Sequence, residues 1–190
     1  ATLKESHYYM TNLSRARHDI ETKSEELDQM SATAMRDPLT HVGSKYAYEK
    51  EAKKLMAEIA EGNARFAIVM VDMNNLKQIN DEHGHKAGDQ YIKGCCHLIC
   101  EAFKHSPIYR IGGDEFVVFL EGYDYENKDN LFNLFKQEIL KNRRQNDVVV
   151  AAGMAEYLPQ QDRSYEQVFQ RADEMMYRNK REIKAMAKEN

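Results

Sequence analysis

Two short apolar runs separated by a pair of glycines constrain the fold more than any other part of the sequence. The runs cover residues 108–111 and 116–120, and Gly112-Gly113 between them is the dipeptide that a tight two-residue hairpin with positive φ requires. Strands joined by such a turn run antiparallel, so the sheet that contains them cannot be wholly parallel. We therefore expect an α+β fold in which helices flank a central antiparallel or mixed sheet.

The remaining apolar patterns predict two more strands and a series of helices. Residues 66–71 form an unbroken apolar run that is typical of a central strand buried on both faces, and residues 148–155 indicate another inner strand. Amphipathic spacing and capping residues predict helices at 44–61, 74–83, after residue 89, at 128–142 and from 165 onward.

The N-terminal segment has a different character. It contains no Pro or Gly from residue 3 to residue 35, and Leu13, Ile20, Leu27 and Ala34 recur every seven residues, as in one seam of a coiled coil. The second seam is weak, so we expect a helical stalk that pairs only when assisted; a single amphipathic helix folded back on the domain is the alternative. Asp37-Pro38 ends the helix, which divides the chain into a stalk of residues 1–36 and a domain of residues 37–190.

Composition limits the classes of partner. The 190 residues suffice for one domain, and 27 Lys and Arg against 31 Asp and Glu argue against a nucleic-acid partner. The apolar runs are too short to span a membrane, so we expect no membrane contact from this segment, and no signal peptide opens the chain. Cys95, Cys96 and Cys100 are expected to be reduced core residues of a cytoplasmic protein, without a metal or disulfide role.

Acidic residues stand where strands end or begin. Asp114 and Glu115 follow the glycine pair, beside backbone that a ligand can approach closely, and Asp72 follows the first inner strand. Each also has an ordinary explanation, because a carboxylate after a turn is usually solvated, and Asp72 or Asp89 would suit the start of a helix. A basic cluster near the C-terminus contains Lys180 and Lys184; it becomes a phosphate clamp only if it faces the carboxylates.

Taken together, these features resemble the GGDEF domain family, the diguanylate cyclases, over roughly residues 37–184. The resemblance is carried by six motifs in order: Asp37-Pro-Leu-Thr40, Val71-Asp-Met-Asn-Asn-Leu-Lys-Gln-Ile-Asn-Asp81, Gly84-His85 with Gly88-Asp89, Gly112-Gly-Asp-Glu-Phe116, Ala152-Gly-Met154, and Ala172-Asp-Glu-Met-Met-Tyr177 with Lys180. It implies a palm-like nucleotide cyclase fold and the condensation of two GTP into cyclic di-GMP and two pyrophosphates.

The resemblance also implies roles for individual residues. Mg²⁺ or Mn²⁺ would be held by Asp72, Asp114 and the Met73 carbonyl, which are hard oxygen ligands. Asp114, or alternatively Glu115, would accept the proton of the attacking 3′-hydroxyl. Lys77 would stabilise charge on the transferred phosphate, and Lys180 and Lys184 would bind phosphate, Lys184 standing where the family has arginine.

Guanine recognition and assembly follow from the same resemblance. Asp89 and Asn80 would bind the edge of guanine, His85 lies in the same loop, and Leu76 replaces a usual Phe beside the base. One GTP per domain implies a C2 homodimer, and the stalk implies an upstream sensory domain missing from this fragment. Residues 103–106 read Phe-Lys-His-Ser where the family's inhibitory Arg-x-x-Asp motif stands, so we expect no feedback inhibition there.

Two alternatives compete with this interpretation. The chain could be a catalytically weak GGDEF domain that acts as a GTP-binding regulator or scaffold, a role that loss of the metal-binding acids would indicate. It could also be a cyclase that makes a 3′,5′-cyclic mononucleotide, since such enzymes share the fold and the metal chemistry. Chromatography of the products formed from GTP separates all three.

Overall fold

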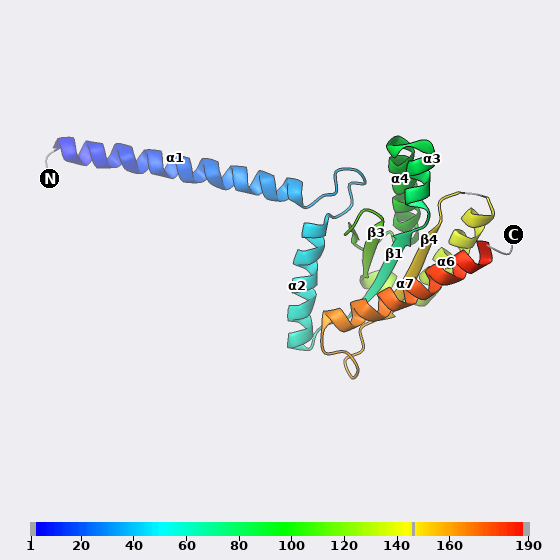
Figure 1. The fold of residues 1–190 in the computed structure, drawn as a ribbon. Helices are drawn as coiled ribbons and strands as arrows, with labels where there is room; N and C mark the ends of the chain where they lie inside the picture. The colour runs from blue at the N-terminus through cyan, green and yellow to red at the C-terminus, as the bar shows by residue number, and fades with distance from the viewer. Residues whose placement is uncertain (1–2, 146, 188–190) are drawn as a thin grey trace.

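The computed structural model describes residues 3–145 and 147–187 (Figure 1). Its sheet has four strands, β1 (Ala67–Met73), β2 (Ile108–Arg110), β3 (Glu115–Leu120) and β4 (Val150–Glu156). Their order is β2-β3-β1-β4, and every neighbouring pair is antiparallel. The α+β prediction is therefore confirmed, with a wholly antiparallel sheet and β1 near its centre.

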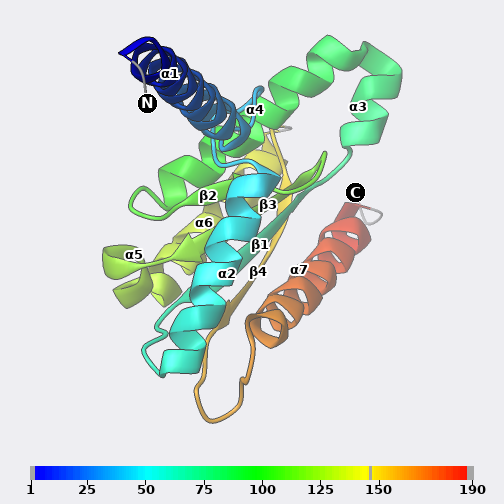
Figure 2. The same ribbon diagram turned by 90° about the vertical axis from the view of Figure 1, so that its left-hand side faces the viewer.

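Helices cover both faces of the sheet. The helices are α1 (Leu3–Ala34), α2 (Lys45–Glu61), α3 (Leu76–His83), α4 (His85–Ala102), α5 (Gly122–Glu126), α6 (Lys128–Arg144) and α7 (Tyr165–Ala187). Two buried apolar clusters result, one between the sheet and α2 with α7, the other between the sheet and α4 with α6. Figure 2 shows α2 in front of the strands. The short helix α5 was not predicted from the sequence.

Alternation along β1 decides which side chain faces which layer. Ile68 and Met70 pack in the cluster beneath α2 and α7, whereas Val69 and Val71 pack in the cluster beneath α4 and α6. By the same alternation, Asp72 lies on the α7 side of the sheet. It is a residue of the strand itself, so the alternative that it caps the following helix is wrong.

The start of α4 also differs from the prediction. The helix begins at His85, a full turn before Asp89, so Asp89 does not cap it. Gly88 lies within this helix and is buried. A Cβ at that position would lie 2.8 Å from Asn80 Cγ, so the close approach of Asn80 requires a glycine. Gly88 therefore allows a close contact between α3 and α4.

The turn between β2 and β3 is wider than the two-residue hairpin predicted from Gly112-Gly113. Arg110 pairs with Phe116, so five residues lie between the paired positions. The amides of Ile111 and Gly112 both donate to the Glu115 carbonyl oxygen, and neither glycine of the pair has a positive φ. Because the longer loop spreads the reversal of direction over more residues, the left-handed conformation is not required.

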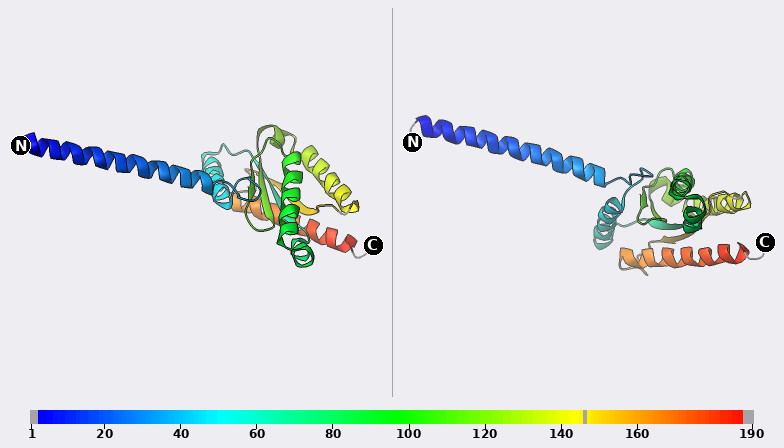
Figure 3. Two further views of the ribbon diagram at one scale, coloured as in Figure 1. Left: turned by 90° about the horizontal axis from the view of Figure 1, so that it is seen from above. Right: turned by 45° about the horizontal axis from the view of Figure 1, so that its top comes forward.

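Helix α1 projects away from the rest of the molecule (Figures 1 and 3). The side chains of the seven-residue repeat are largely exposed, at 51% for Leu13, 67% for Ile20 and 66% for Leu27. The alternative of a helix folded back on the domain is therefore wrong. Residues 3–145 and 147–187 thus leave this apolar stripe uncovered.

Candidate active site

Two carboxylates face each other at one end of the two interior strands. Asp72 of β1 is directly opposite Glu115 of β3, and alternation places both on the side that α7 covers. Asp72 is only 6% exposed. Like charges opposite one another on a sheet destabilise it, so this pair needs a compensating positive charge.

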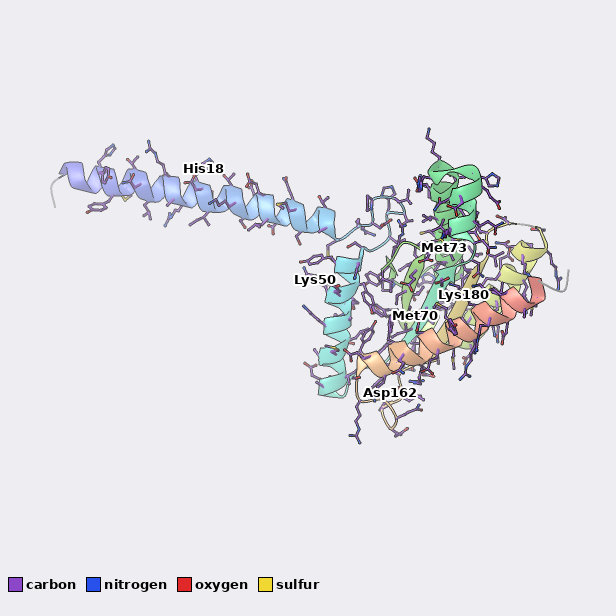
Figure 4. All side chains as sticks on the ribbon, in the orientation of Figure 1. His18, Lys50, Met70, Met73, Asp162 and Lys180 are labelled. Atoms are coloured by element: carbon purple, nitrogen blue, oxygen red, sulfur yellow. The ribbon has the colours of Figure 1, made fainter. Side chains whose placement is uncertain are left out.

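Helix α7 supplies that charge. Lys180 Nζ donates to Asp72 Oδ1 at 2.6 Å, and Figure 4 shows Lys180 on α7 beneath the end of β1 at Met73. The amide of Ala152 in β4 donates to Asn179 Oδ1 at 3.0 Å, which fixes the turn of α7 that carries the lysine. The sheet and the helix thus hold the ion pair from both sides.

Asp114 joins the same end of the sheet from the turn. Its carbonyl oxygen accepts a 2.8 Å hydrogen bond from the amide of Met73, which places the turn against the end of β1. Asp114 is half-buried and directly precedes β3, and its charge raises the pKa of both Asp72 and Glu115. The three acids therefore gather at one end of the sheet.

Negative charge predominates among the acids at this end of the sheet. Burial raises the pKa of Asp72 above its ordinary value of 3.8; the hydrogen bond and charge of Lys180 oppose the rise, and the charge of Asp114 adds to it. Burial likewise raises the pKa of Glu115 above 4.5, and Asp114 and Asp72 raise it further. A cation bound here would relieve both shifts.

A cavity of about 510 Å³ opens beside these acids. It is lined by six of the residues that the resemblance singled out, namely Met73, Leu76, Lys77, Asp114, Lys180 and Lys184. Three basic side chains thus share a cavity with a carboxylate and with the backbone at the end of β1. The arrangement suits a phosphate group bound through a divalent cation.

Three predicted residues lie elsewhere. Asn80, His85 and Asp89 are on α3 and α4 and are not among the residues that line this cavity. The Asn80 side chain packs against Gly88, the residue before Asp89, so two of the three residues are neighbours in space. The site therefore has two parts, a basic and acidic cavity under α7 and a polar junction between α3 and α4.

The residues present fit a hard divalent cation. Within residues 3–145 and 147–187, no three His, Cys, Asp or Glu side chains are arranged to hold a metal ion. The expected set differs from such a cluster, because it combines two carboxylates with a backbone carbonyl. Carboxylate and carbonyl oxygens are the ligands that Mg²⁺ prefers, and a divalent cation would also reduce the repulsion between the acids.

Asn74 is a residue of this site that the sequence reasoning missed. It is only 4% exposed, and neither its side-chain oxygen nor its nitrogen has a hydrogen-bond partner in the described part of the chain. It lines the cavity beside Met73. Unpaired buried amides are costly, so this one suits a contact with a ligand. The signal in the sequence was its place two residues after Asp72.

The second missed feature holds the turn. Arg110 Nη2 donates to the Gly113 carbonyl oxygen at 2.8 Å, while its Nη1 contacts both carboxylate oxygens of Asp37 at 3.3 Å. The amide and hydroxyl of Thr40 also donate to Asp37. The segment that follows α1 is therefore fixed to the turn that carries Asp114. An arginine directly before the turn was the available signal.

Known proteins are similar to this chain in sequence and in fold. The family model described as "Diguanylate cyclase, GGDEF domain" matches residues 34–185. The diguanylate cyclase DgcS of Shewanella oneidensis is 34% identical over 98 residues, which are 51% of this chain and 33% of that protein. The probable diguanylate cyclase DgcE of Escherichia coli is 31% identical over 57% of this chain and 10% of its own length. The chain thus spans a third or less of these relatives.

A solved structure extends the likeness to the N-terminal helix. The coiled coil and GGDEF domain of DgcB from Caulobacter crescentus, solved with c-di-GMP, matches with a TM-score of 0.71 and 26% identity. The match covers 91% of this chain and 94% of that one. No helix within the described ranges is both long and apolar enough to cross a membrane. By motif order, fold and family match, the chain belongs to the GGDEF diguanylate cyclase family.

Proposed function

We propose that this chain condenses two GTP molecules into cyclic di-GMP and two pyrophosphates. The observation that carries the proposal is the cavity in which Asp114 meets Lys77, Lys180 and Lys184, beside the ion pair of Lys180 with Asp72. Loss of the acids would have favoured the alternative role of a GTP-binding regulator, and the acids are present. Family membership supports cyclic di-GMP synthesis in particular.

The side chains have distinct roles in the reaction. Asp72, Asp114 and the Met73 carbonyl would hold Mg²⁺ or Mn²⁺, which when bound would neutralise phosphate charge and lower the pKa of the attacking 3′-hydroxyl. Lys180 and Lys184 bind the phosphates, and Lys77 stabilises the charge that develops on the transferred group. Asp114 accepts the hydroxyl proton, with Glu115 as the second candidate.

The junction between α3 and α4 provides base recognition. Asp89 is exposed and negatively charged, and a carboxylate matches the two donors on the edge of guanine. Asn80, His85 and Leu76 complete the binding region. Asp89 thereby favours GTP over ATP, because adenine presents an acceptor where guanine presents its ring N–H.

Turnover requires two copies of the domain, since each holds one GTP. The exposed stripe of Leu13, Ile20 and Leu27 on α1 offers the surface through which two stalks pair as a coiled coil. The likeness of α1 and the domain to the coiled-coil structure of DgcB supports this arrangement. A sensory domain that precedes the stalk would control the pairing.

Feedback inhibition at the usual position is not expected. Phe103 stands where the inhibitory motif has arginine and is 1% exposed. Ser106 stands where the motif has aspartate, and its hydroxyl donates to Asp124 inside the protein. Neither side chain is available to bind cyclic di-GMP. Calorimetry should therefore detect no saturable binding that depends on residues 103–106.

The direct test is a product assay on purified protein with GTP and Mg²⁺ at several protein concentrations. We expect cyclic di-GMP by chromatography, with a rate that rises more steeply than protein concentration. Asp114→Ala should abolish the product while circular dichroism stays unchanged, and Asp129→Ala, an exposed residue of α6, should not matter. GTP binding without product would favour the regulator, and a cyclic mononucleotide would favour the other cyclase class.

A further inference from the structure

Helix α4 carries a pair of thiols on one face. Cys96 and Cys100 are four residues apart, so their side chains lie one turn apart on the same side of the helix. Their Sγ atoms are 4.0 Å apart, and both are free thiols. Cys96 is 6% exposed and Cys100 is half-buried, so the pair lies at the boundary of the core rather than inside it.

The two thiols open onto a cavity of about 370 Å³. Its wall combines one face of α4 with the segment that follows α1, and its lining residues are Leu39, Thr40, His41, Lys93, Cys96, His97 and Cys100. Two imidazoles therefore border the same space as two thiols. None of these residues lines the cavity beside Asp114, so the two places are separate.

The separation of the sulfur atoms distinguishes a metal site from a disulfide. A disulfide requires the sulfurs to close to about 2.0 Å and the Cβ atoms to about 3.5–4.5 Å, whereas Cβ atoms four residues apart on a helix lie about 5–6 Å apart. Closing the bond would therefore distort α4. Two thiolates bound to one tetrahedral Zn²⁺ at about 2.3 Å have sulfurs about 3.8 Å apart. The observed 4.0 Å needs almost no backbone movement to meet that geometry.

We propose that Cys96 and Cys100 form the fixed half of a binding site for Zn²⁺. The remaining ligands come from the imidazoles of His41 and His97, both exposed and free to turn into the cavity, or from water. These side chains do not converge as they stand, since no group of three metal-binding side chains is formed within the described ranges.

The position of the site gives it a structural consequence. Thr40 and His41 belong to the short segment between α1 and α2, in which Asp37 binds Thr40 and Arg110. A metal ion held by α4 and by His41 would join the middle of α4 to this segment. The proposal concerns binding alone and does not depend on cyclase activity.

The test uses Cd²⁺ as the spectroscopic probe, titrated into the full chain under reducing conditions with excess Mg²⁺ present. Thiolate ligation gives an ultraviolet charge-transfer absorption that carboxylate ligation does not give. We expect the absorption to saturate at one equivalent, to disappear in Cys96→Ser and in Cys100→Ser, and to persist in Cys95→Ser, which changes a buried cysteine of the same helix outside this cavity. Absorption unaffected by the first two variants would overturn the proposal.

A second measurement needs no variant and so does not depend on how the variants fold. Zn²⁺ should slow alkylation of Cys100 by iodoacetamide in the native protein at least tenfold, as read by mass spectrometry, and a chelator should restore the rate. An unchanged rate, or a Cys96–Cys100 disulfide formed with diamide as readily with Zn²⁺ as without it, would refute the site. Asp114→Ala should bind Zn²⁺ with the same stoichiometry, which separates this outcome from that of the cyclase assay.

Discussion

Gly153→Ala should push α7 away from the sheet. Gly153 of β4 faces α7, and a Cβ there would lie 2.8 Å from the Met175 carbonyl carbon and closer still to the Ala172 oxygen and the Met176 nitrogen. Carbon atoms in contact sit about 3.5–4.0 Å apart, so the helix would have to retreat by about 1 Å or more. All three obstacles are backbone atoms, which cannot rotate aside as a side chain can.

The expected cost lies at the upper end of that for overpacked cores, about 3 kcal/mol. In a domain of this size it lowers the melting temperature by about 6–12 °C. Because α7 carries Lys180, the same shift lengthens the 2.6 Å bond to Asp72, so product formation should fall as well. Urea denaturation and the GTP assay measure the two effects.

A matched glycine provides the control. A Cβ at Gly113 would have no atom of the described residues within 4 Å, and the φ of Gly113 is not positive. The free energy of unfolding of Gly113→Ala should therefore lie within about 0.5 kcal/mol of that of the parent protein. If Gly153→Ala is equally neutral and keeps full activity, the close packing of β4 on α7 does not position Lys180 and the reasoning fails.

Three further predictions follow from the site and the stalk. Arg110→Ala removes the contacts to Asp37 and Gly113 and should lower the free energy of unfolding by about 2–3 kcal/mol in urea denaturation, because it leaves a charged group unpaired. In metal-free buffer, Asp114→Asn should lower the pKa values of Asp72 and Glu115 in carboxyl NMR titrations. It should also raise the melting temperature near pH 7 by a few degrees, which corresponds to a gain of about 1 kcal/mol in the free energy of unfolding. Ile20→Asp should weaken dimerisation roughly tenfold or more in sedimentation, because pairing would bury an uncompensated charge.

The sign of the pH effect follows from the direction of the shifts. Asp72 and Glu115 have raised pKa values in the folded protein, so their ionisation costs stability, and the cost develops as pH rises from about their unfolded values through the raised ones. The Asp37 carboxylate behaves in the opposite way. Burial alone would raise its pKa, but hydrogen bonds from Thr40 and the Arg110 charge lower it overall, so its stabilisation is lost as pH falls below 3.8.

Each of these predictions has its own control. Arg65→Ala removes an exposed ion pair and should change stability by less than about 1 kcal/mol; an equal effect from Arg110→Ala would contradict the role of the clamp. Unchanged titrations of Asp72 and Glu115 in Asp114→Asn would show that Asp114 does not act on them. Thr22→Asp places the same charge on α1 away from the apolar stripe, so dimerisation should survive it.

The sequence predicted an element correctly wherever its residues had one dominant conformational preference. The apolar run of β1 and the serine and glycine that cap α2 fixed those elements, with Ser44 accepting from the amide of Ala47 and Gly62 in the left-handed conformation. The start of α4 was misplaced because Gly88 serves a contact with Asn80 that only the tertiary structure reveals. The two-residue turn was wrong because contacts from Arg110 and the neighbouring strand end, rather than the glycine pair, set the loop.

The candidate site shows the same division. The residues that motif order assigned to the phosphates do line one cavity, yet no pattern in the sequence gave the pairing of Lys180 with Asp72, which lie 108 positions apart. Asn74 escaped notice because the sequence suggested only that it begins a helix. Its burial without a hydrogen-bond partner among the described residues is what marks it.

The strand order β2-β3-β1-β4 has a consequence for how such a site can evolve. Asp72 and Glu115 are mounted on the two interior strands, which are paired on both sides and are the last parts of a sheet to open. Lys180 and Lys184 lie on the outer helix α7, and Lys77 lies on α3. Substitutions along α7 can therefore change the basic side of the cavity while the strands that carry the acids keep their pairing.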